Sequence, residues 1–553
     1  MHLERIEIAG FRGIKRLSLS FDELTVLIGE NAWGKSSLLD ALSLALCPSA
    51  EFYEMKFSDF HIDHAMGHER TSSLQIVLRW HEDYQGEYRA RRYRAFDPFW
   101  NEQHHLKHLY VQIDSHIKND KIITHRHFLH TDGHIIQHPD TDKFLRQLMV
   151  LHPIVRIRDA RQLEYGNTST IPTHNATTVP PAKNRESERI QRRLDNTCRR
   201  LMTQPGHVSA AEIKSSINTL RSLVDHYFAF APHTRTKAEP HTYYPLENQY
   251  LNPFDQLVQP RMTKQAKLIL MGLLNAYIRA RGPVDLKRIS RPIMILEDPE
   301  GRLHPIMLHQ AWAFIQNMPM QKVLTTNSPE LLSVVPLTAI KRLQRTPQKT
   351  VVHGVNNGEL NKDDIRKVTF HVRMHRPSAF YARVWLLVEG ETEVWLFNEM
   401  AHLTGHNLVA EGIHVIEFAQ SGLKPLIKLA RLLGIEWHLV ADGDPAGRKY
   451  ADKVRTLLNN DSERERLTVL PAKDIEHFLF KKGYEPLFRQ LANISDNDQI
   501  PIRKIIYRAL KKHAKPDVAL AIVQYTRESD SDKMPLLIRW VLKRVIIMAR
   551  GII

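Results

Sequence analysis

The feature that most constrains this chain is an eight-residue motif near its start, Gly29-Glu30-Asn31-Ala32-Trp33-Gly34-Lys35-Ser36. It matches G-x-x-x-x-G-K-[ST], follows the apolar segment Leu24–Ile28 and precedes leucines that recur at helical spacing from residue 38 to residue 46. Strand, glycine-rich loop and helix in this order bind phosphate, because the loop amides and the helix N-terminus face the negative charge. The sequence therefore predicts an α/β nucleotide-binding domain.

The residue types within this motif predict a role for each position. We expect Lys35 to reach the β- and γ-phosphates of ATP and the Ser36 hydroxyl to bind Mg²⁺. Asn31, Gly34 and Ser37 complete the nucleotide contacts expected from the loop and the first helical turn.

A phosphate-binding loop of this kind needs an acidic partner at the end of another strand. Four apolar residues, Ile293–Leu296, lead into Glu297-Asp298-Pro299-Glu300. We expect Glu297 to hold Mg²⁺ through water and Asp298 to orient the attacking water as a catalytic residue. A further short strand, Lys322–Thr326, precedes Asn327-Ser328-Pro329.

A second α/β unit is predicted from residue 384 onward. Short apolar strands alternate there with helical segments, which is the pattern of a mostly parallel sheet. The predicted strands are Val384–Val388, His414–Phe418, Trp437–Val440 and Leu467–Leu470.

Two of these strands run directly into acidic residues. Glu389-Gly390-Glu391-Thr392-Glu393 follows the first, and Asp442-Gly443-Asp444 follows the third. Parallel sheets place their sites at the carboxyl ends of strands, and clustered carboxylates suit Mg²⁺ or Mn²⁺. The alternative is loop carboxylates that face solvent, which the buried strands before them disfavour.

Three segments of the first half carry a family resemblance. Gly10-Phe11-Arg12-Gly13 resembles the "FR" turn of SMC-type and RecF-type ATPases, whose arginine lies beside the nucleotide. Residues 297–300 with Leu303-His304-Pro305 resemble their "DEPE…LHP" Walker B and D-loop, and residues 325–329 resemble their "TTHSP" switch. The resemblance implies an ABC-type ATPase.

The chain departs from that pattern in three places. Asn327 stands where the family has its switch histidine, and Asp298 is one methylene shorter than the usual glutamate. Arg261–Gln265 stands where a serine–glycine signature is expected. The resemblance therefore implies ATP binding, while turnover and ATP-driven dimer closure stay open.

The acidic motifs of the second half resemble the Toprim domain, whose signature is V-E-G-x-T-E followed by D-x-D. An ABC-type ATPase followed by Toprim resembles the OLD (overcoming lysogenization defect) family. This resemblance implies Glu389 as metal ligand or general base and Asp442 and Asp444 as metal ligands. It further implies a second metal site formed by Glu393, Asp474 and Glu476.

The family's catalytic lysine is matched by Lys515. Lys504, Lys511 and Lys512 are close in sequence, so a solvated basic face explains this lysine equally well.

These motifs divide the chain into predicted domains. We expect an ATPase domain over residues 1–165 and 231–345, a connection over 346–380 and a Toprim domain over 381–553. Residues 166–230 are predicted to form a loop and a helical hairpin. The apolar stripes of the hairpin fit either a dimer contact or packing on its own domain.

Charge and composition limit the partners. The net charge of +16 favours a polyanion such as DNA, although a solvated basic surface is the alternative. Two cysteines, apolar runs too short to span a bilayer and the lack of a leader after Met1 predict a cytoplasmic protein with no membrane contact. We further expect a homodimer, and the need for a helicase or another partner protein stays open.

The function predicted from the sequence is an ATP-regulated, Mg²⁺- or Mn²⁺-dependent DNA endonuclease. The alternative is a non-catalytic DNA-repair or clamp-type ATPase that binds DNA without cutting it. A topoisomerase is disfavoured because no strand-passage domain with a nucleophilic tyrosine is evident, and a primase because zinc-binding cysteines are missing.

Overall fold

The described residues of the computed structural model separate into two compact units, which are treated individually below. The first comprises Met1–Val335 and Ala339–Val352, and the second Pro336–Thr338 and His353–Ile553. No helix within the described ranges is both long and apolar enough to cross a membrane. The described ranges are 1–47, 52–63, 69–157, 290–301, 305–316, 320–419, 421–495, 498–528 and 534–551.

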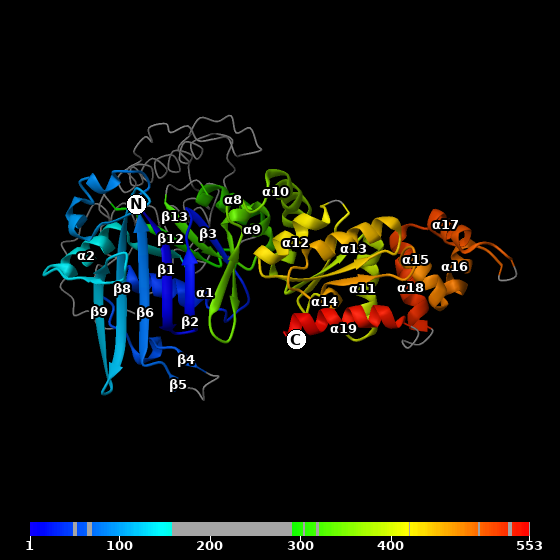
Figure 1. The fold of residues 1–553 in the computed structure, drawn as a ribbon, viewed down its shortest axis with the longest axis horizontal. Helices are drawn as coiled ribbons and strands as arrows, with labels where there is room; N and C mark the ends of the chain where they lie inside the picture. Colours follow the sequence, from blue (N-terminus) through cyan, green and yellow to red (C-terminus); the bar gives the residue numbers. More distant parts are fainter. Residues whose placement is uncertain are drawn as a thin grey trace, which may run out of the picture. The chain divides into compact units, whose positions relative to one another are not determined.

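The first unit is built on a mixed sheet, 13-stranded as described, whose antiparallel half comes mainly from residues 2–136 (Figure 1). The antiparallel strands are β1 (His2–Phe11), β2 (Ile14–Ser20), β6 (Ser73–His81), β7 (Asn101–Gln103), β8 (Leu106–Lys118), β9 (Lys121–Leu129) and β10 (Ile135–Ile136). Asn119 and Asp120 make the tight turn between β8 and β9, with φ of 51° and 57°.

The other half of this sheet is parallel and carries the nucleotide motifs. The neighbours run in the order β14-β3-β13-β12-β11, each parallel to the next. Parallel alignment brings the carboxyl ends of β3, β12 and β13 to one edge of the sheet. These strands are β3 (Leu24–Ile28), β11 (Ile154–Ile157), β12 (Ile293–Glu297), β13 (Gln321–Thr325) and β14 (Ile340–Arg345), and β15 (Thr350–Gly354) lies between β14 and β2.

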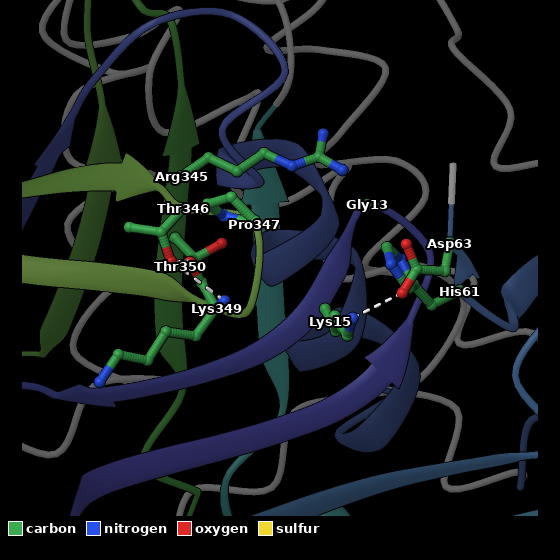
Figure 2. A pocket seen from close by; sticks show the side chains of 9 residues that line it. All are labelled: Gly13, Lys15, His61, Asp63, Arg345, Thr346, Pro347, Lys349 and Thr350. Carbon is green, nitrogen blue, oxygen red and sulfur yellow. Dashed lines mark hydrogen bonds and ion pairs between the residues drawn. The ribbon is translucent and has the colours of Figure 1, made fainter. Parts of the chain in front are cut away.

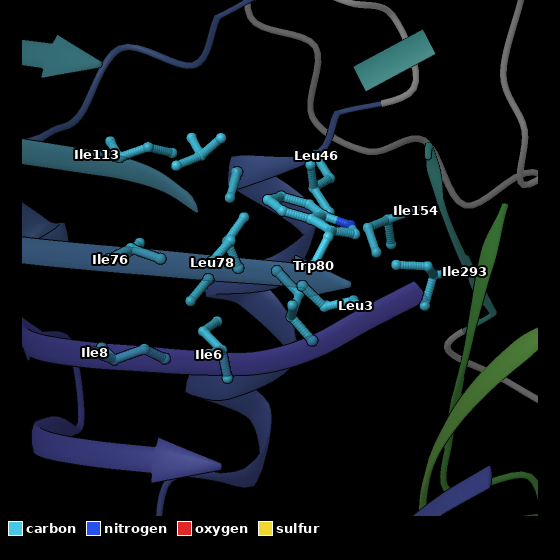
Figure 3. Packing of buried hydrophobic residues seen from close by; sticks show 14 of the residues in the cluster. Leu3, Ile6, Ile8, Leu46, Ile76, Leu78, Trp80, Ile113, Ile154 and Ile293 are labelled. Atoms are coloured by element: carbon cyan, nitrogen blue, oxygen red, sulfur yellow. The ribbon is translucent and has the colours of Figure 1, made fainter. Parts of the chain in front are cut away.

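The core of the first unit lies between this sheet and its helices. Trp80 is fully buried among aliphatic side chains from β1, β6 and the parallel strands, including Leu3, Ile154 and Ile293 (Figure 3). The helices of this unit are α1 (Lys35–Ala45), α2 (Thr141–Leu151), α8 (Pro305–Gln316) and α9 (Pro329–Val334).

The second unit contains a four-stranded, wholly parallel sheet in the order β17-β16-β18-β19. All five residues of β16 are buried, as expected of a strand covered on both faces. The predicted parallel α/β unit is therefore confirmed. Its strands are β16 (Val384–Val388), β17 (Ile413–Glu417), β18 (Glu436–Ala441) and β19 (Leu467–Val469).

Helices from the end of the chain complete the core of the second unit. α18 packs against α11, and α19 packs against β16 and β18. α10, within the stretch 346–380 that was expected to connect the domains, packs against α12. The helices are α10 (Lys362–Val368), α11 (Glu391–Leu403), α12 (Leu423–Leu432), α13 (Pro445–Leu457), α14 (Glu463–Arg466), α15 (Ile475–Leu479), α16 (Glu485–Ala492), α17 (Ile502–Lys512), α18 (Lys515–Glu528) and α19 (Leu536–Arg550).

Candidate functional site

The predicted phosphate-binding loop follows β3 and leads directly into α1. Gly34 precedes α1 with φ of 97°, which glycine adopts without strain. The buried Lys35 ammonium donates to the carbonyl oxygens of Gly29 and Glu30, the second at 3.3 Å. Burial lowers the pKa of Lys35, although the negative charge of Asp298 opposes this. Because its partners are carbonyl oxygens, a phosphate oxygen can replace them.

The other predicted contacts of this loop differ in their surroundings. Asn31 and Ser36 are exposed at the loop and at the start of α1. The Ser37 hydroxyl oxygen instead accepts a hydrogen bond of 3.3 Å from the Gly13 amide, which ties α1 to the turn between β1 and β2. The loop thus presents two polar side chains outward and uses one for internal support.

The predicted acidic partners lie at the same sheet edge as the loop. Glu297 at the end of β12 pairs in register with Thr325 of β13, which pairs with Leu27 of β3. The Thr325 hydroxyl donates to Asp298 Oδ1 at 3.2 Å. Asp298 has a φ of 44°, a strained conformation for a residue with a side chain. The fold therefore brings Lys35, Glu297 and Asp298 to one edge.

Arg12, predicted to lie beside the nucleotide, is held by two carboxylates. Its guanidinium donates to Asp59 Oδ1 at 2.9 and 2.8 Å and also contacts Asp40 of α1. Burial opposes the charge of Arg12, but the hydrogen bond with Asp59 and the charge of Asp40 raise its pKa. Arg12 thus links the turn between β1 and β2 to α1.

Arg156 of β11 extends this network to the acidic edge. It donates to Glu297 Oε2 at 2.7 and 3.0 Å and also contacts Asp40. The chain of ion pairs runs Asp59–Arg12–Asp40–Arg156–Glu297. The sequence analysis missed Arg156; its one signal was a lone charge inside a buried strand, which needs a partner.

The loop after β13 is tied to the acidic motif through Glu300. The backbone N–H of Asn327 donates a hydrogen bond of 2.6 Å to Glu300 Oε1. Burial raises the pKa of Glu300, and hydrogen bonds from this loop oppose the rise. Glu300 Oε2 is buried and has no hydrogen-bond partner among the described residues. Glu300, to which the sequence analysis assigned no role, thus carries an unsatisfied oxygen at this edge.

A cavity of about 190 Å³ lies near Gly34, where an added Cβ atom would lie 3.9 Å from the hydroxyl oxygen of the lining residue Thr350 (Figure 2). One wall comes from the turn between β1 and β2 and from His61 and Asp63 at the short strand β4 (Ile62–Asp63), and the other from the turn between β14 and β15. The Lys15 ammonium pairs with Asp63 at 2.5 Å. Sequence analysis missed this cavity, because its walls come from three distant segments. The lining residues are Gly13, Lys15, His61, Asp63, Arg345, Thr346, Pro347, Lys349 and Thr350.

The second unit brings together the acidic residues predicted at its sheet edge. Glu389 follows β16, and its Oε2 is buried without a hydrogen-bond partner within the described ranges. Burial raises the pKa of Glu389, and the charges of Asp444 and Glu393 raise it further. A buried, unsatisfied carboxylate oxygen beside two other carboxylates is a site that attracts a cation.

Asp442, after β18, has a strongly raised pKa. Burial raises its pKa to about 8, and the charges of Glu393, Glu389, Asp474 and Glu476 add to the rise. Asp442 therefore interacts with carboxylates that lie 32 to 53 positions away in the sequence. Asp442, Asp444, Glu389, Glu393, Asp474 and Glu476 together are called the acidic centre below.

Two aspartates of the acidic centre also cap helices. Asp444 Oδ1 accepts a hydrogen bond of 2.7 Å from the Gly447 amide at the start of α13. Asp474 Oδ1 accepts from the His477 amide at 2.8 Å at the start of α15, and His477 Nδ1 lies 2.5 Å from the same oxygen. The caps fix both carboxylates in place, and His477 is a neighbour that the sequence analysis missed.

Gly447 allows α13 to begin directly against the strand end. A Cβ atom on Gly447 would lie 2.1 Å from the carbonyl oxygen of Asp442, closer than any real contact. Only glycine therefore lets the helix pass over the backbone of Asp442. This requirement explains why the motif continues as Asp-Gly-Asp-Pro-Ala-Gly.

The donor set of the acidic centre fits a hard divalent cation, because it consists of carboxylate oxygens. Throughout the described structure, however, no group of three or more His, Cys, Asp or Glu side chains is arranged around one ion position. Like-charged carboxylates repel one another until a cation compensates them. The side chains would have to draw closer when an ion binds.

Several predicted features fall outside the described residues. They include the loop and hairpin over 166–230, the segment Arg261–Gln265 and the pair Leu303-His304. Lys515 is the first residue of α18, but its side chain is not described.

Comparison with known proteins shows the family. The chain belongs to the family described as Protein of unknown function (DUF2813), whose profile matches residues 1–379. Residues 380–444 match the Overcoming lysogenization defect protein-like TOPRIM domain, which confirms the resemblance to OLD proteins.

A full-length relative, Uncharacterized protein YbjD from Escherichia coli strain K12, is 40% identical over 564 residues, and the match covers 100% of both chains. Two solved structures are also similar. The C-terminal region of the Xanthomonas campestris pv. campestris OLD protein is 20% identical, with a TM-score of 0.27, over 31% of this chain and 98% of its own. The SMC head domain from Thermotoga maritima is 12% identical, with a TM-score of 0.32, over 64% of this chain and 100% of its own.

Proposed function

We propose that this protein is an ATP-regulated, Mg²⁺- or Mn²⁺-dependent endonuclease that nicks or cleaves DNA. The observation that carries the proposal is the acidic centre, in which neighbouring carboxylates and burial raise the pKa of Asp442 to about 8. Such a cluster is relieved by bound cations, and carboxylate-bound cations are a recurrent means of phosphodiester cleavage. The match of residues 380–444 to the OLD-like TOPRIM domain supports the same reaction class.

The residues of the acidic centre would have different roles in cleavage. Divalent ions bound there would neutralise the phosphate and activate water. Glu389, whose pKa is raised, can accept the proton of the attacking water. Lys515 would offset the charge that develops on the phosphate. One ion would be held by Glu389, Asp442 and Asp444, and a second by Glu393, Asp474 and Glu476.

The first unit would bind ATP and regulate cleavage. Lys35 would exchange its carbonyl partners for the β- and γ-phosphates, while Ser36 and Glu297 hold Mg²⁺. Asp298 would orient the attacking water. The cavity near Gly34, whose walls include Lys15, Arg345 and Lys349, would bind the nucleoside.

Two assembly proposals accompany this function. ABC-type heads act in pairs, so we expect a homodimer, to which the segment 185–227 would contribute. The net charge of +16 supports DNA as the polyanionic partner.

A non-catalytic DNA-binding ATPase is the second candidate. It is favoured by one observation: among the described residues, the carboxylates are not arranged around one ion position. That protein would bind DNA but cut none in any divalent metal.

Cleavage of supercoiled plasmid in Mg²⁺ and in Mn²⁺, with and without ATP, tests the proposal. The wild-type chain should cut, and Asp442→Ala should lose ~10²-fold or more in rate, as expected when a group stabilising the transition state is removed. DNA binding should be nearly unchanged in the variant. A wild-type chain that cuts under none of these conditions would leave the second candidate standing.

A further inference from the structure

The exposed face of α17 carries a stripe of basic side chains around a tyrosine. Ile505, Ile506 and Ala509 are buried, and they attach the helix to the core of the second unit. On the opposite face, four exposed residues follow the helical spacing i, i+3, i+4 and i+7. These are Lys504, Tyr507, Arg508 and Lys511, called the basic stripe below.

The charge of the basic stripe is not compensated locally. α17 contains no acidic residue, and no ion pair joins the stripe to any carboxylate within the described ranges. α10 in the same unit shows the contrast. There Arg366 and Lys367 pair with Asp363 of their own helix at 2.8 and 2.7 Å. The cations of the basic stripe thus remain available to an external anion.

α17 also packs against the helix next to which two residues of the acidic centre lie. It packs against α15, whose N-cap is Asp474 and whose first turn contains Glu476. α15 has five residues and is therefore only about 7 Å long. The helix that bears the basic stripe therefore packs within one short helix length of two proposed metal ligands.

We propose that the basic stripe is a DNA-binding surface that holds the phosphate backbone of the substrate next to the acidic centre. The inference rests on the proposed nuclease function and extends it by naming where the duplex is held. Lys504 and Lys511 are seven residues apart, or roughly 10 Å along the helix, which lets the three cations contact successive phosphates. Tyr507, 64% exposed between them, can contact sugar or an unstacked base.

The structure favours DNA over an anionic membrane. A basic amphipathic helix binds a bilayer by inserting its apolar face. In α17 that face is occupied, because Ile505, Ile506 and Ala509 pack inside the unit. Only the polar face is free, and phosphate contacts require nothing more.

The salt dependence of DNA binding tests this surface. A labelled short duplex would be titrated with the full chain in EDTA, so that cleavage plays no part. The variant Lys504→Gln/Arg508→Gln/Lys511→Gln removes three proposed phosphate contacts. Each contact contributes about 0.9 to the slope of log K against log salt, so the slope should fall by roughly 2 to 3.

Lys362→Gln/Arg366→Gln/Lys367→Gln on α10 is a control variant with the same change in charge. It should change the slope by less than about 0.9, the contribution of one phosphate contact. Tyr507→Ala should weaken binding of single-stranded DNA several-fold and leave the salt slope unchanged. The inference is overturned if the α17 variant keeps the wild-type slope, or if both triple variants lower it equally. It is also overturned if the α17 variant loses binding only to anionic phospholipid vesicles.

Failure of the nuclease proposal would be recognised separately. If the wild-type chain cuts no plasmid but, of the two triple variants, only the α17 variant lowers the salt slope, the DNA-binding surface is supported and the nuclease proposal is not. If the wild-type chain cuts and the α17 variant binds and cuts as well as wild type, the reverse holds.

Discussion

The carboxylates of the two candidate sites have opposite kinds of charged neighbours. At the nucleotide site, each acidic group of the ion-pair chain faces an arginine, as Glu297 faces Arg156 and Asp59 faces Arg12. At the acidic centre, the charged groups that shift the pKa of Glu389 and Asp442 are all carboxylates. The first site is electrostatically balanced by the protein itself, whereas the compensating charge at the second would have to come from a bound cation.

This difference separates what each ligand must do. ATP and Mg²⁺ would have to displace existing bonds of Lys35 and Glu297, so their binding is an exchange. A divalent ion at the acidic centre would instead remove repulsion, so its binding stabilises the fold. Neutralising one charge should therefore destabilise the first unit and stabilise the second.

The largest effect is expected from Glu389→Gln. Loss of this carboxylate should lower the rate of plasmid cleavage by ~10²-fold or more, since it removes a proposed metal ligand and proton acceptor. Binding of a fluorescent ATP analogue should be unchanged. Glu391→Gln, at an exposed position of the same motif, is the control and should cut like wild type. Equal losses in both variants would remove Glu389 from the centre.

Arg156→Gln should destabilise the first unit by about 3 kcal/mol, because it removes the buried arginine that pairs with both Glu297 and Asp40. Urea unfolding followed by circular dichroism measures this change. Arg5→Gln removes an exposed pair with Glu7 and should cost less than about 1 kcal/mol. Similar costs for the two variants would show that the nucleotide site is not balanced as described.

Lys35→Ala should weaken ATP binding about tenfold or more, since the ammonium would form charge-assisted bonds to the phosphates. Isothermal titration of ATP with Mg²⁺ gives the affinity. Lys118→Ala, at an exposed position before the turn joining β8 and β9, provides the matched control. Wild-type affinity in Lys35→Ala would contradict the assignment of the loop.

The smallest effect is a pH dependence that metal should abolish. The pKa of Asp442 rises from 3.8 to about 8 on folding, so between these values the folded state binds more protons than the unfolded state. The free energy of unfolding in EDTA should then fall as pH rises from 5 to 8. The slope is at most about 1.4 kcal/mol per pH unit, and less because solvent screens a partly exposed group.

Asp442→Asn should flatten this dependence and raise the stability in EDTA, whereas Asp452→Asn, an exposed control on α13, should not. Addition of Mn²⁺ should stabilise wild type more than Asp442→Asn. A wild-type profile that rises with pH over this range would contradict the raised pKa.

Features formed by consecutive residues could be predicted from the sequence. The loop around Lys35, the acidic pair after β12 and the carboxylates after β16 and β18 each follow a short apolar strand, and the end of such a strand is visible where polar residues begin. The Arg12–Asp40–Arg156 network was not readable, because its partners lie 28 and 116 positions apart. Nothing in a strand with one arginine tells which carboxylate it will meet.

Distance along the chain also hid other features. The cavity needs the turn between β14 and β15, some 330 residues after the turn between β1 and β2. The arrangement of the carboxylates depends on side-chain positions that strand periodicity does not determine. Asp474 and Glu476 were predicted only through the family resemblance.

The close passage of Gly447 over Asp442 affects how a saturation mutagenesis experiment on this protein should be interpreted. Every substitution at Gly447 would push α13 away from the strand end, so the position would score as intolerant as its neighbour Asp442. Yet Gly447 offers no side-chain atom to metal or substrate. Fitness scores alone would place it among the reactive groups, and only metal affinity measured beside cleavage would separate a scaffold position from a chemical one.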